Sequence, residues 1–467
     1  MSKLFPKVLC LLTCLPIGAS AQLLPLGATF QVSTGTATDA SQPAAASDPA
    51  GNFMIVWMSS DTPAPVGILG RVYDAAGTAQ GSELQVTPDQ GLNPAVAAAG
   101  TETFLVVWAL GPNVLGRVYN ADSAHGEAFS IGGRTDEGGN DPGVACNASG
   151  DCVVVWQLDM NRIGGRRFDR NGLAQGDEFE VTSGDAVQYF PHAAVDDSGN
   201  FVVVWQRFST DPASSAVMAQ RYDRTGAPAG TSFNVATTEN QFAIDASAVA
   251  VTTDPSGTFF VTWDSQINAL ASPFAPMPGN IFARRYDDTG AALSPPTQIT
   301  TQQTYLGFYP AVASDASGNV LLAWREINLG ATERISAQYF SADGAPSGPV
   351  FQVTSSNKTT DTVAVASAAQ GAAVVTWDSN RRIYAQRYQA ASTPTPTRTP
   401  TSSTTSTPAA TDNNGGCNLA PHQSSGSRTS AVLLVPALLV WFRRCFTGRL
   451  RPRWLHSPRV ASAPARR

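Results

Sequence analysis

The side chains in this sequence that could carry out acid–base chemistry are carboxylates placed just after short apolar segments. Asp264 and Asp378 each follow a tryptophan directly, and Glu326 lies two residues after another tryptophan. Glycoside hydrolases cleave their substrate with a pair of carboxyl groups that lie about 5–5.5 Å or about 6.5–9.5 Å apart. A polysaccharide hydrolase or lyase using Asp264 with Glu326 or Asp378 is therefore one hypothesis for the function.

Nucleophilic and metal chemistry has few candidates. The histidines between positions 22 and 390 are His125 and His192, and we expect His192, at the start of an apolar segment, to be structural. No GxSxG, HExxH or P-loop motif occurs. Cys146 and Cys152 flank the turn in ACNASGDC, which predicts a disulfide rather than a zinc site, because two further ligands are not evident nearby.

Aspartates recur in two turn motifs, DxSGN and YDxxG. In such turns the Asp side chain bonds its own backbone and the glycine supplies a positive φ. The motifs lack the DxDxDG spacing that directs several oxygens at one calcium ion. They also differ from the sialidase Asp-box, in which a tryptophan lies close behind the glycine. We predict no cofactor, with calcium at these turns as the alternative.

The elements that must position these side chains are repeated along the chain. Seven tryptophans, at positions 57, 108, 156, 205, 263, 324 and 377, are separated by 48 to 61 residues. Each repeat contains four short segments rich in Val, Ile, Phe and Tyr, bounded by Gly, Asp, Asn or Ser, which is typical of β-strands. Four antiparallel strands repeated radially predict an all-β fold, a β-propeller.

The ends of the repeat region indicate how the ring closes. The last repeat has strand-like segments at 362–367, 372–377 and 383–388, but no fourth one before a Thr/Pro-rich stretch. The segment FQVST at Phe30–Thr34 matches FQVTS at Phe351–Ser355. We therefore expect a seven-bladed propeller closed by the N-terminal strand, and an open array is the alternative.

A long polar residue lies two positions before the aromatic residue of every third strand. We expect its stem to lie on the neighbouring sheet and its end to bond loop carbonyls. A ring of arginines that binds an anion is the alternative. These residues are Arg71, Arg117, Arg166, Gln220, Arg284, Gln338 and Gln386.

The two ends of the chain resemble targeting segments rather than folded domains. Lysines precede an apolar run and small residues, which predicts a signal peptide cleaved between Ala21 and Gln22; a lipoprotein signal at Cys14 is the alternative. After the repeats comes a spacer too poor in apolar side chains to fold, then a short apolar run with arginines. The predicted parts are a signal peptide (1–21), the propeller (22–390), a disordered Thr/Pro/Ser-rich spacer (391–430), a hydrophobic segment with an Arg cluster (431–444) and a basic tail (445–467).

Charge separates these parts. Residues 22–390 carry 18 basic and 35 acidic side chains, a net charge of −17, whereas the part from Ala391 onward holds ten arginines and one acid. A domain this acidic repels phosphate backbones, so nucleic-acid binding is not expected.

The C-terminal part resembles the tripartite sorting signals of Gram-negative surface proteins. The resemblance rests on the order of spacer, Gly416-Cys417, apolar run and arginines. It implies delivery to the cell surface or outer membrane with processing at Cys417, or release from the cell. In this chain 23 residues follow the arginines, where such signals normally end, and a simple membrane tether through the apolar segment is the alternative.

The repeats themselves resemble those of large exported and surface bacterial proteins. The phrase GNFVVVWQ followed by an AQRYDxxG strand carries this resemblance. It implies location and shape, and it implies no particular chemistry.

Binding residues are expected on the loops that vary between repeats, which follow each tryptophan strand or join two blades. Aromatic, carboxylate and arginine side chains there suit a glycan or a peptide. We favour an exported, monomeric, non-enzymatic protein that binds an extracellular glycan or protein. The candidates are Arg207, Phe208, Asp264, Phe274, Arg325, Glu326, Asp378 and Arg381, with Tyr189, Phe190, Phe308 and Tyr309 between blades.

Overall fold

The structure is a computed structural model that describes residues 22–391, apart from 36–38, 61–66, 88–90, 121–123, 134–140, 211–212, 238–247, 267–278, 301–304, 329–331, 355–361 and 369–370. The predictions for Ala21, Phe274, Gly416, Cys417 and the C-terminal segments lie outside these residues. Within the described ranges, no helix is long and apolar enough to cross a membrane.

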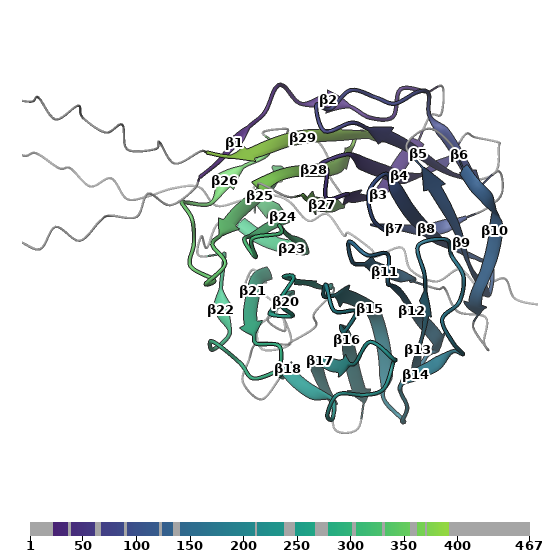
Figure 1. The fold of residues 1–467 in the computed structure, drawn as a ribbon. Helices are drawn as coiled ribbons and strands as arrows, with labels where there is room; N and C mark the ends of the chain where they lie inside the picture. The colour runs from purple at the N-terminus through teal and green to yellow at the C-terminus, as the bar shows by residue number, and fades with distance from the viewer. Residues whose placement is uncertain are drawn as a thin grey trace, which may run out of the picture. The chain divides into compact units, whose positions relative to one another are not determined.

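Seven antiparallel sheets surround a central axis and form a β-propeller (Figure 1). Blade 4 shows the pattern, because its four strands are hydrogen-bonded in chain order: β15 (Val187–Val195), β16 (Phe201–Thr210), β17 (Ala213–Tyr222) and β18 (Phe233–Thr237). In β16 successive side chains point to opposite faces of the sheet. Val203 packs toward blade 3 and Val204 toward blade 5. Both faces are buried, which explains why the tryptophan strands are almost continuously apolar.

The other blades repeat this order. Blade 1 contains β3 (Asp39–Ser47), β4 (Phe53–Ser60), β5 (Gly67–Tyr73) and β6 (Leu84–Thr87); blade 2 contains β7 (Leu92–Ala98), β8 (Thr103–Leu110), β9 (Asn113–Asn120) and β10 (Ala124–Gly133); blade 3 contains β11 (Gly143–Cys146), β12 (Cys152–Asp159), β13 (Arg162–Phe168) and β14 (Phe179–Thr182). Blade 5 contains β19 (Val249–Thr253), β20 (Phe259–Gln266), β21 (Gly279–Tyr286) and β22 (Thr297–Gln298); blade 6 contains β23 (Tyr305–Ser314), β24 (Val320–Asn328), β25 (Glu333–Phe340) and β26 (Phe351–Gln352).

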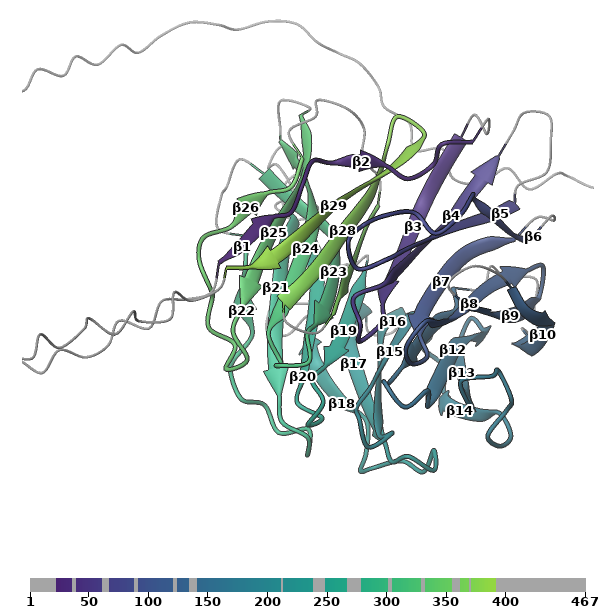
Figure 2. The same cartoon turned by 45° about the horizontal axis from the view of Figure 1, so that its top comes forward.

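Blade 7 joins the two ends of the described chain. Its first three strands are β27 (Val363–Ser367), β28 (Ala372–Ser379) and β29 (Arg382–Ala390). The outer position is taken by β1 (Leu23–Pro25) and β2 (Phe30–Gln31), which both pair with β29 (Figure 2). The predicted closure by the N-terminal strand is therefore confirmed. It uses two short strands rather than one, separated by a bend at Gly27, where φ is 77°.

The residues that hold the blades together are the repeated aromatic side chains. The tryptophan of every repeat is almost fully buried, with exposed fractions of 0–3%. In blade 4, Phe201 stacks on Tyr222 with ring centroids 4.8 Å apart, and Phe179 of blade 3 leans on Tyr222 at 5.3 Å. Burying one such ring contributes about 2–3 kcal/mol. A buried tryptophan in each blade and a phenyl–tyrosyl contact between neighbouring blades therefore account for the repeat seen in the sequence.

The column of long polar residues is structural, as expected. Arg166 donates to the carbonyl of Gly176 (3.2 Å) and Gln220 to that of Gly230 (3.1 Å). Four of the other members bond equivalent loop oxygens, whereas Arg71 donates to the carbonyl of Val32 (3.4 Å) in the preceding blade. Four of the arginines also lie over the aromatic ring of their own strand, 5.3–5.8 Å from its centroid.

The aspartate turns also have the predicted structure. Asp196 accepts hydrogen bonds from the backbone and side-chain nitrogens of Asn200 (2.9 and 3.0 Å). Hydrogen bonds from Thr225 and Ala227 hold the pKa of Asp223 below its usual range. No group of three or more potential metal ligands exists among the described residues.

The predicted disulfide between Cys146 and Cys152 is present and joins the ends of β11 and β12.

Candidate functional site on the upper face

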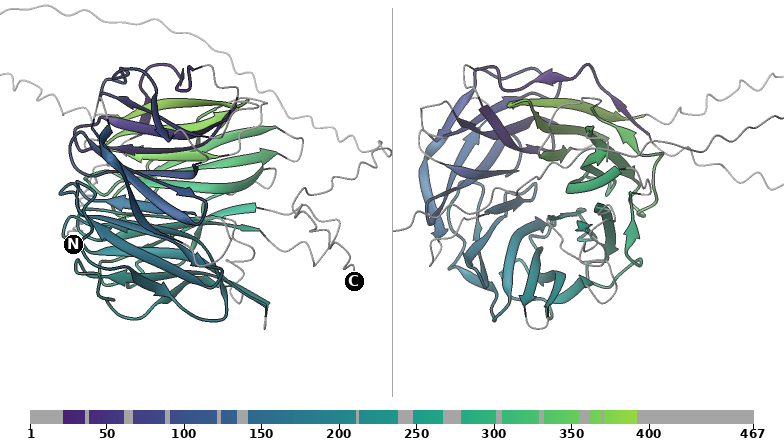
Figure 3. Two further views of the ribbon diagram at one scale, coloured as in Figure 1. Left: turned by 90° about the vertical axis from the view of Figure 1, so that its right-hand side faces the viewer. Right: turned by 180° about the vertical axis from the view of Figure 1, so that it is seen from behind.

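The strands run from one side of the ring to the other, so the loops gather on two opposite faces (Figure 3). We call the side with the DxSGN and YDxxG turns the lower face. The upper face carries the loops after the tryptophan strands and the loops between blades, and the candidate binding residues that the structure describes belong to it.

Asp264 is a buried link between blades 5 and 6. Its exposed fraction is 0%. One carboxylate oxygen accepts the backbone N–H of Ala248 (2.8 Å), and the other accepts that of Tyr309 (3.3 Å). A carboxylate bonded in this way orients the chain around it and is closed to an incoming substrate.

Glu326 is the centre of a second buried network. Its two oxygens accept hydrogen bonds from the indole of Trp324 (2.8 Å), the guanidinium of Arg334 (2.5 Å) and the hydroxyl of Ser336 (2.8 Å). Arg334 in turn lies 3.7 Å over the ring of Tyr305, a cation–π contact. With 4% of its surface exposed, Glu326 holds strands together, and its lone pairs are engaged.

Asp378, equivalent to Asp264 in blade 7, has the same kind of role. It accepts the backbone N–H (2.7 Å) and hydroxyl (3.1 Å) of Thr362 and is 5% exposed. The carboxylates proposed for catalysis from the sequence are thus buried and bonded to their own framework.

The predicted arginines differ in their surroundings. Arg325 pairs with Glu333 (3.1 Å), and both side chains are largely covered. Arg381 lies in the two-residue turn between β28 and β29, where its φ is 62°, 3.8 Å from Asp39. Arg207 is exposed on β16, and its neighbour Phe208 is half-buried.

An unexpected feature of the upper face is a set of strained residues in the first strands. Each lies directly before a proline and has a φ of 51–52°, and each coincides with a β-bulge in the pairing of its strand. A left-handed backbone costs a non-glycine residue about 1–2 kcal/mol. Such strain persists where the side chain or the bulge is needed. The four residues are Gln42, Asn93, Phe190 and Tyr309.

Two of these strained positions carry the predicted aromatic pairs. The rings of Tyr189 and Phe190 are 5.9 Å apart, and those of Phe308 and Tyr309 are 6.5 Å apart. Phe308 packs against the position of Gly279 in the neighbouring blade, whereas Tyr309 remains 39% exposed. The bulge therefore turns Tyr309 out to solvent while Asp264 holds its backbone. The sequence signal for these positions is an aromatic residue before proline at the start of a strand.

His192 breaks the pattern of small residues around the central axis. Its six equivalents, paired like His192 with the residue before the tryptophan, are Ala44, Ala95, Gly143, Ala250, Ala311 and Ala364. The histidine is exposed, and no hydrogen bond joins its ring to another residue of the described ranges. The side chain touches solvent, but the protein atoms around it partly desolvate the imidazole and lower its pKa to about 4. The imidazole is therefore neutral at neutral pH, and no hydrogen bond of its ring supports the structural role expected for His192.

Nearer the lower face, the axis opens into a cavity of about 350 Å³ lined by all seven first strands. Most of the lining side chains are alanine and valine, such as Ala45, Ala193 and Val312. Three aspartates at its rim, Asp48, Asp254 and Asp315, cap their own turns. The cavity therefore offers little that would orient a polar ligand.

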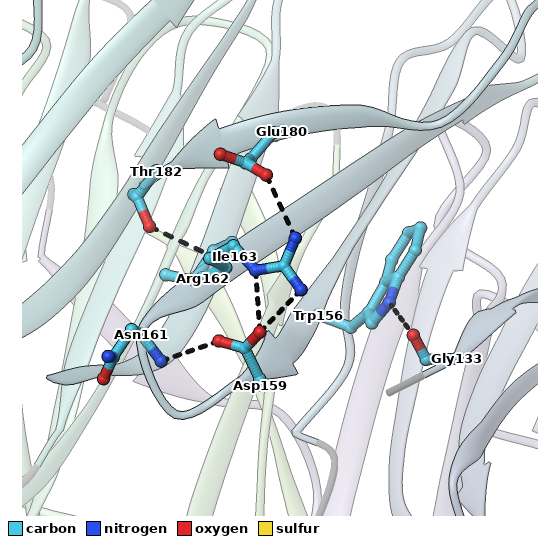
Figure 4. Close-up of polar contacts among 8 residues, drawn as sticks. All are labelled: Gly133, Trp156, Asp159, Asn161, Arg162, Ile163, Glu180 and Thr182. Carbon is cyan, nitrogen blue, oxygen red and sulfur yellow. Dashed lines mark hydrogen bonds and ion pairs between the residues drawn. The ribbon is translucent and has the colours of Figure 1, made fainter. Parts of the chain in front are cut away.

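A charged cluster that the sequence did not single out lies in blade 3, at the upper turn between β12 and β13 (Figure 4). Arg162 bonds Asp159 (2.7 Å) and reaches Glu180 on the outer strand (3.4 Å). Burial opposes ionisation of Asp159, but hydrogen bonds from Asn161 and Arg162 outweigh it and hold the pKa of this carboxyl below its usual range. All three charges are partly exposed, as in an ordinary surface ion pair.

No protein-family model matches this sequence, and no curated protein matches it. Solved structures do match its fold. An ulvan lyase, described as a new family of polysaccharide lyase bound to a GlcA–Rha3S unit, superposes with a TM-score of 0.50 at 10% identity over 77% of this chain and 96% of that chain. A protein of unknown function from Dyadobacter fermentans gives 0.46 at 10% identity, over 80% and 100% of the two chains. An α-L-arabinanase from Penicillium chrysogenum gives 0.46 at 13% identity, over 69% and 99%. At these identities the likeness concerns the fold alone, and the chain is a seven-bladed β-propeller.

Proposed function

We propose that this protein is an exported propeller that binds an extracellular glycan or protein at its upper face, without cleaving it. The observation that carries the proposal is the contrast between aromatic and acidic side chains on that face. Tyr309 is exposed and held in a strained backbone, while Asp264, Glu326 and Asp378 are buried and accept hydrogen bonds from their own framework. An exposed ring can stack on a sugar or a peptide side chain, but it does not hydrolyse a glycosidic bond.

Location is a further part of the proposal. We propose that residues 1–21 direct export and that the C-terminal segment tethers or sorts the protein to the bacterial surface. The disulfide between Cys146 and Cys152 supports an oxidising compartment.

The enzymatic alternative keeps one supporting observation, which is His192. A neutral, exposed imidazole can accept a proton, which a lyase removes from its substrate, but its lowered pKa makes His192 a weaker base than an ordinary histidine. The alternative would therefore depend on His192 rather than on the acids first proposed.

The test is retention of the purified chain on a panel of bacterial and host polysaccharides, scored for both binding and new chain ends. We expect retention without new ends. Tyr309→Ala should weaken retention by at least tenfold, whereas Leu173→Ala, at an exposed leucine of the lower face, should leave it unchanged. New ends that disappear in His192→Ala would replace the binding proposal with a lyase. Retention that Tyr309→Ala does not change would move the binding site elsewhere.

A further inference from the structure

At every junction between blades there is a space between the outer strand of one blade and the third-strand aromatic residue of the next. We call this space the socket, and a side chain of the outer strand normally fills it. The filling residue faces an alanine or glycine of the third strand, as Phe233 faces Ala219, and it packs on the aromatic residue of the next blade. In five junctions the ring centroids are 5.3–5.7 Å apart. The filling residues are Phe30, Leu84, Phe129, Phe179, Phe233 and Phe351.

The junction between blades 5 and 6 lacks this outer-strand residue. Thr297 faces Ala283 at the equivalent position, and it is exposed. Phe340 of blade 6 contacts a ring from the second strand of blade 5 instead, that of Phe260, with centroids 5.5 Å apart. A cavity of about 400 Å³ is found there, with Phe260 and Phe340 in its lining and the exposed Leu293 and Val350 beside them. This volume lies in the range of small-molecule sites and is larger than a void that takes up benzene.

An arginine at the same junction is also without its usual partners. Arg167 and Arg221 reach across to carbonyl oxygens in the next blade's turn, at 2.8 Å and 2.7 Å, and Arg387 does the same at 2.6 Å. Arg285 is the equivalent residue of blade 5. Within the part of the chain that the structure describes, its guanidinium makes no hydrogen bond or ion pair, although it lines the cavity. Asp343 lies nearby, and its pKa is held below the usual range mainly by hydrogen bonds from Ser341 and Ala345, with a smaller contribution from the charge of Arg285.

The socket and the arginine are adjacent. A Cβ placed on Gly290, in the filled junction, would lie 2.9 Å from Arg221 Cδ and 3.6 Å from a ring carbon of Phe233. At Gly344, its equivalent in the open junction, Arg285 Cδ lies at 3.3 Å and no other heavy atom lies within 4 Å. The ring is missing while the arginine remains in place.

We infer that the cavity between blades 5 and 6 binds a phenyl group joined by a short chain to a carboxylate. The ring would occupy the place that phenylalanine fills elsewhere, against Phe340 and Phe260. The carboxylate would accept hydrogen bonds from Arg285, which suits an ionised pair at a partly exposed site. Two sources share this chemistry: a free aromatic acid, and the C-terminal phenylalanine of a peptide. The site is on the outer rim of the ring and is independent of the upper face.

The experiment is a calorimetric titration of the full chain with phenylpropionate. We expect a Kd of about 1 mM or tighter, as is reasonable for a ligand of this size. Phenylpropionamide, which lacks the charge, should bind at least tenfold more weakly. The peptide Gly-Gly-Phe distinguishes the two sources: tighter binding of the peptide than of phenylpropionate favours a peptide C-terminus, and the reverse favours a free aromatic acid. The C-terminal amide of the same peptide is the control that lacks the carboxylate.

Two variants make the test specific. Thr297→Phe should abolish binding and raise the midpoint of thermal unfolding, because it fills the socket as the other junctions do. Arg285→Gln should weaken binding at least tenfold, whereas the matched variant Arg221→Gln should not change it. If Thr297→Phe fails to fold, Thr297→Leu gives the same test, with Leu84 as its precedent. The proposal is wrong if phenylpropionate does not bind at millimolar concentration. It is also wrong if phenylpropionate binds Thr297→Phe or Arg285→Gln as tightly as it binds the parent.

Discussion

The two faces of the ring use the same residue type, aspartate, in opposite ways. On the lower face, Asp169 and Asp223 accept hydrogen bonds from residues two and four positions later, so each turn stabilises itself. On the upper face, Asp264 accepts bonds from Ala248 and from Tyr309, 45 residues away. The same local cap can therefore recur from repeat to repeat, although arginines such as Arg167 also bond a carbonyl of the neighbouring turn. Long-range caps tie together loops that differ in each blade, which allows the upper face to vary while remaining ordered.

The largest effect is expected from breaking the upper-face network at Glu326. Glu326→Ala leaves the indole of Trp324, the hydroxyl of Ser336 and the charge of Arg334 without their acceptor. Loss of one member of a buried charged network costs about 3 kcal/mol of unfolding free energy. Chemical denaturation of the parent and variant gives the value. Glu180→Ala, which removes a partly exposed partner of Arg162, is the control and should cost less than about 0.5 kcal/mol. Equal losses would contradict the contrast between buried and exposed acids.

A smaller effect is expected on the lower face. Asp169→Ala removes two hydrogen bonds within one turn, to Asn171 and Leu173 (both 2.9 Å), and should lower the unfolding free energy by about 1 kcal/mol. Asp169→Asn retains one acceptor oxygen and should recover most of the loss. If Asp169→Ala cost as much as Glu326→Ala in the same denaturation experiment, the lower turns would not be independent units.

Relief of backbone strain should act in the opposite direction. Tyr309→Gly removes the cost of a positive φ and keeps the N–H that Asp264 accepts, but it adds entropy to the unfolded chain. We expect a net gain of about 0.5 kcal/mol in unfolding free energy together with loss of ligand retention. A variant that is less stable than the parent would show that the ring of Tyr309 serves packing rather than binding.

The smallest effect concerns pH. His192 has a pKa of about 4 in the folded protein, below the ordinary value of 6.5. Between pH 4 and 6.5 His192 binds a proton in the unfolded chain but not in the folded protein. The unfolding free energy should therefore fall as the pH drops from 6.5 toward 4. Because the side chain is exposed, solvent screening should limit the change to about 0.5 kcal/mol. His192→Ala, which matches the other blades, should remove this part of the pH dependence. An unchanged pH profile would mean that His192 titrates normally.

The sequence by itself determined the ring. Tryptophans 48 to 61 residues apart, turn motifs at constant positions and the displaced FQVST segment specified seven blades and their closure. They did so because strand alternation and turn chemistry are local, and a repeat that buries both faces must stack on copies of itself. The disulfide and the column of arginines and glutamines followed from the same local logic.

Only the tertiary structure decided which side chains are available for function. Asp264, Glu326 and Asp378 follow the tryptophan strands in sequence, as accessible catalytic acids could, but the neighbouring segments bury them. Conversely, Thr297 is unremarkable in sequence, and its junction becomes a cavity because the opposing residues come from another blade. The physical reason is that exposure and hydrogen bonding depend on contacts between residues distant in the chain, which the spacing of a repeat does not encode.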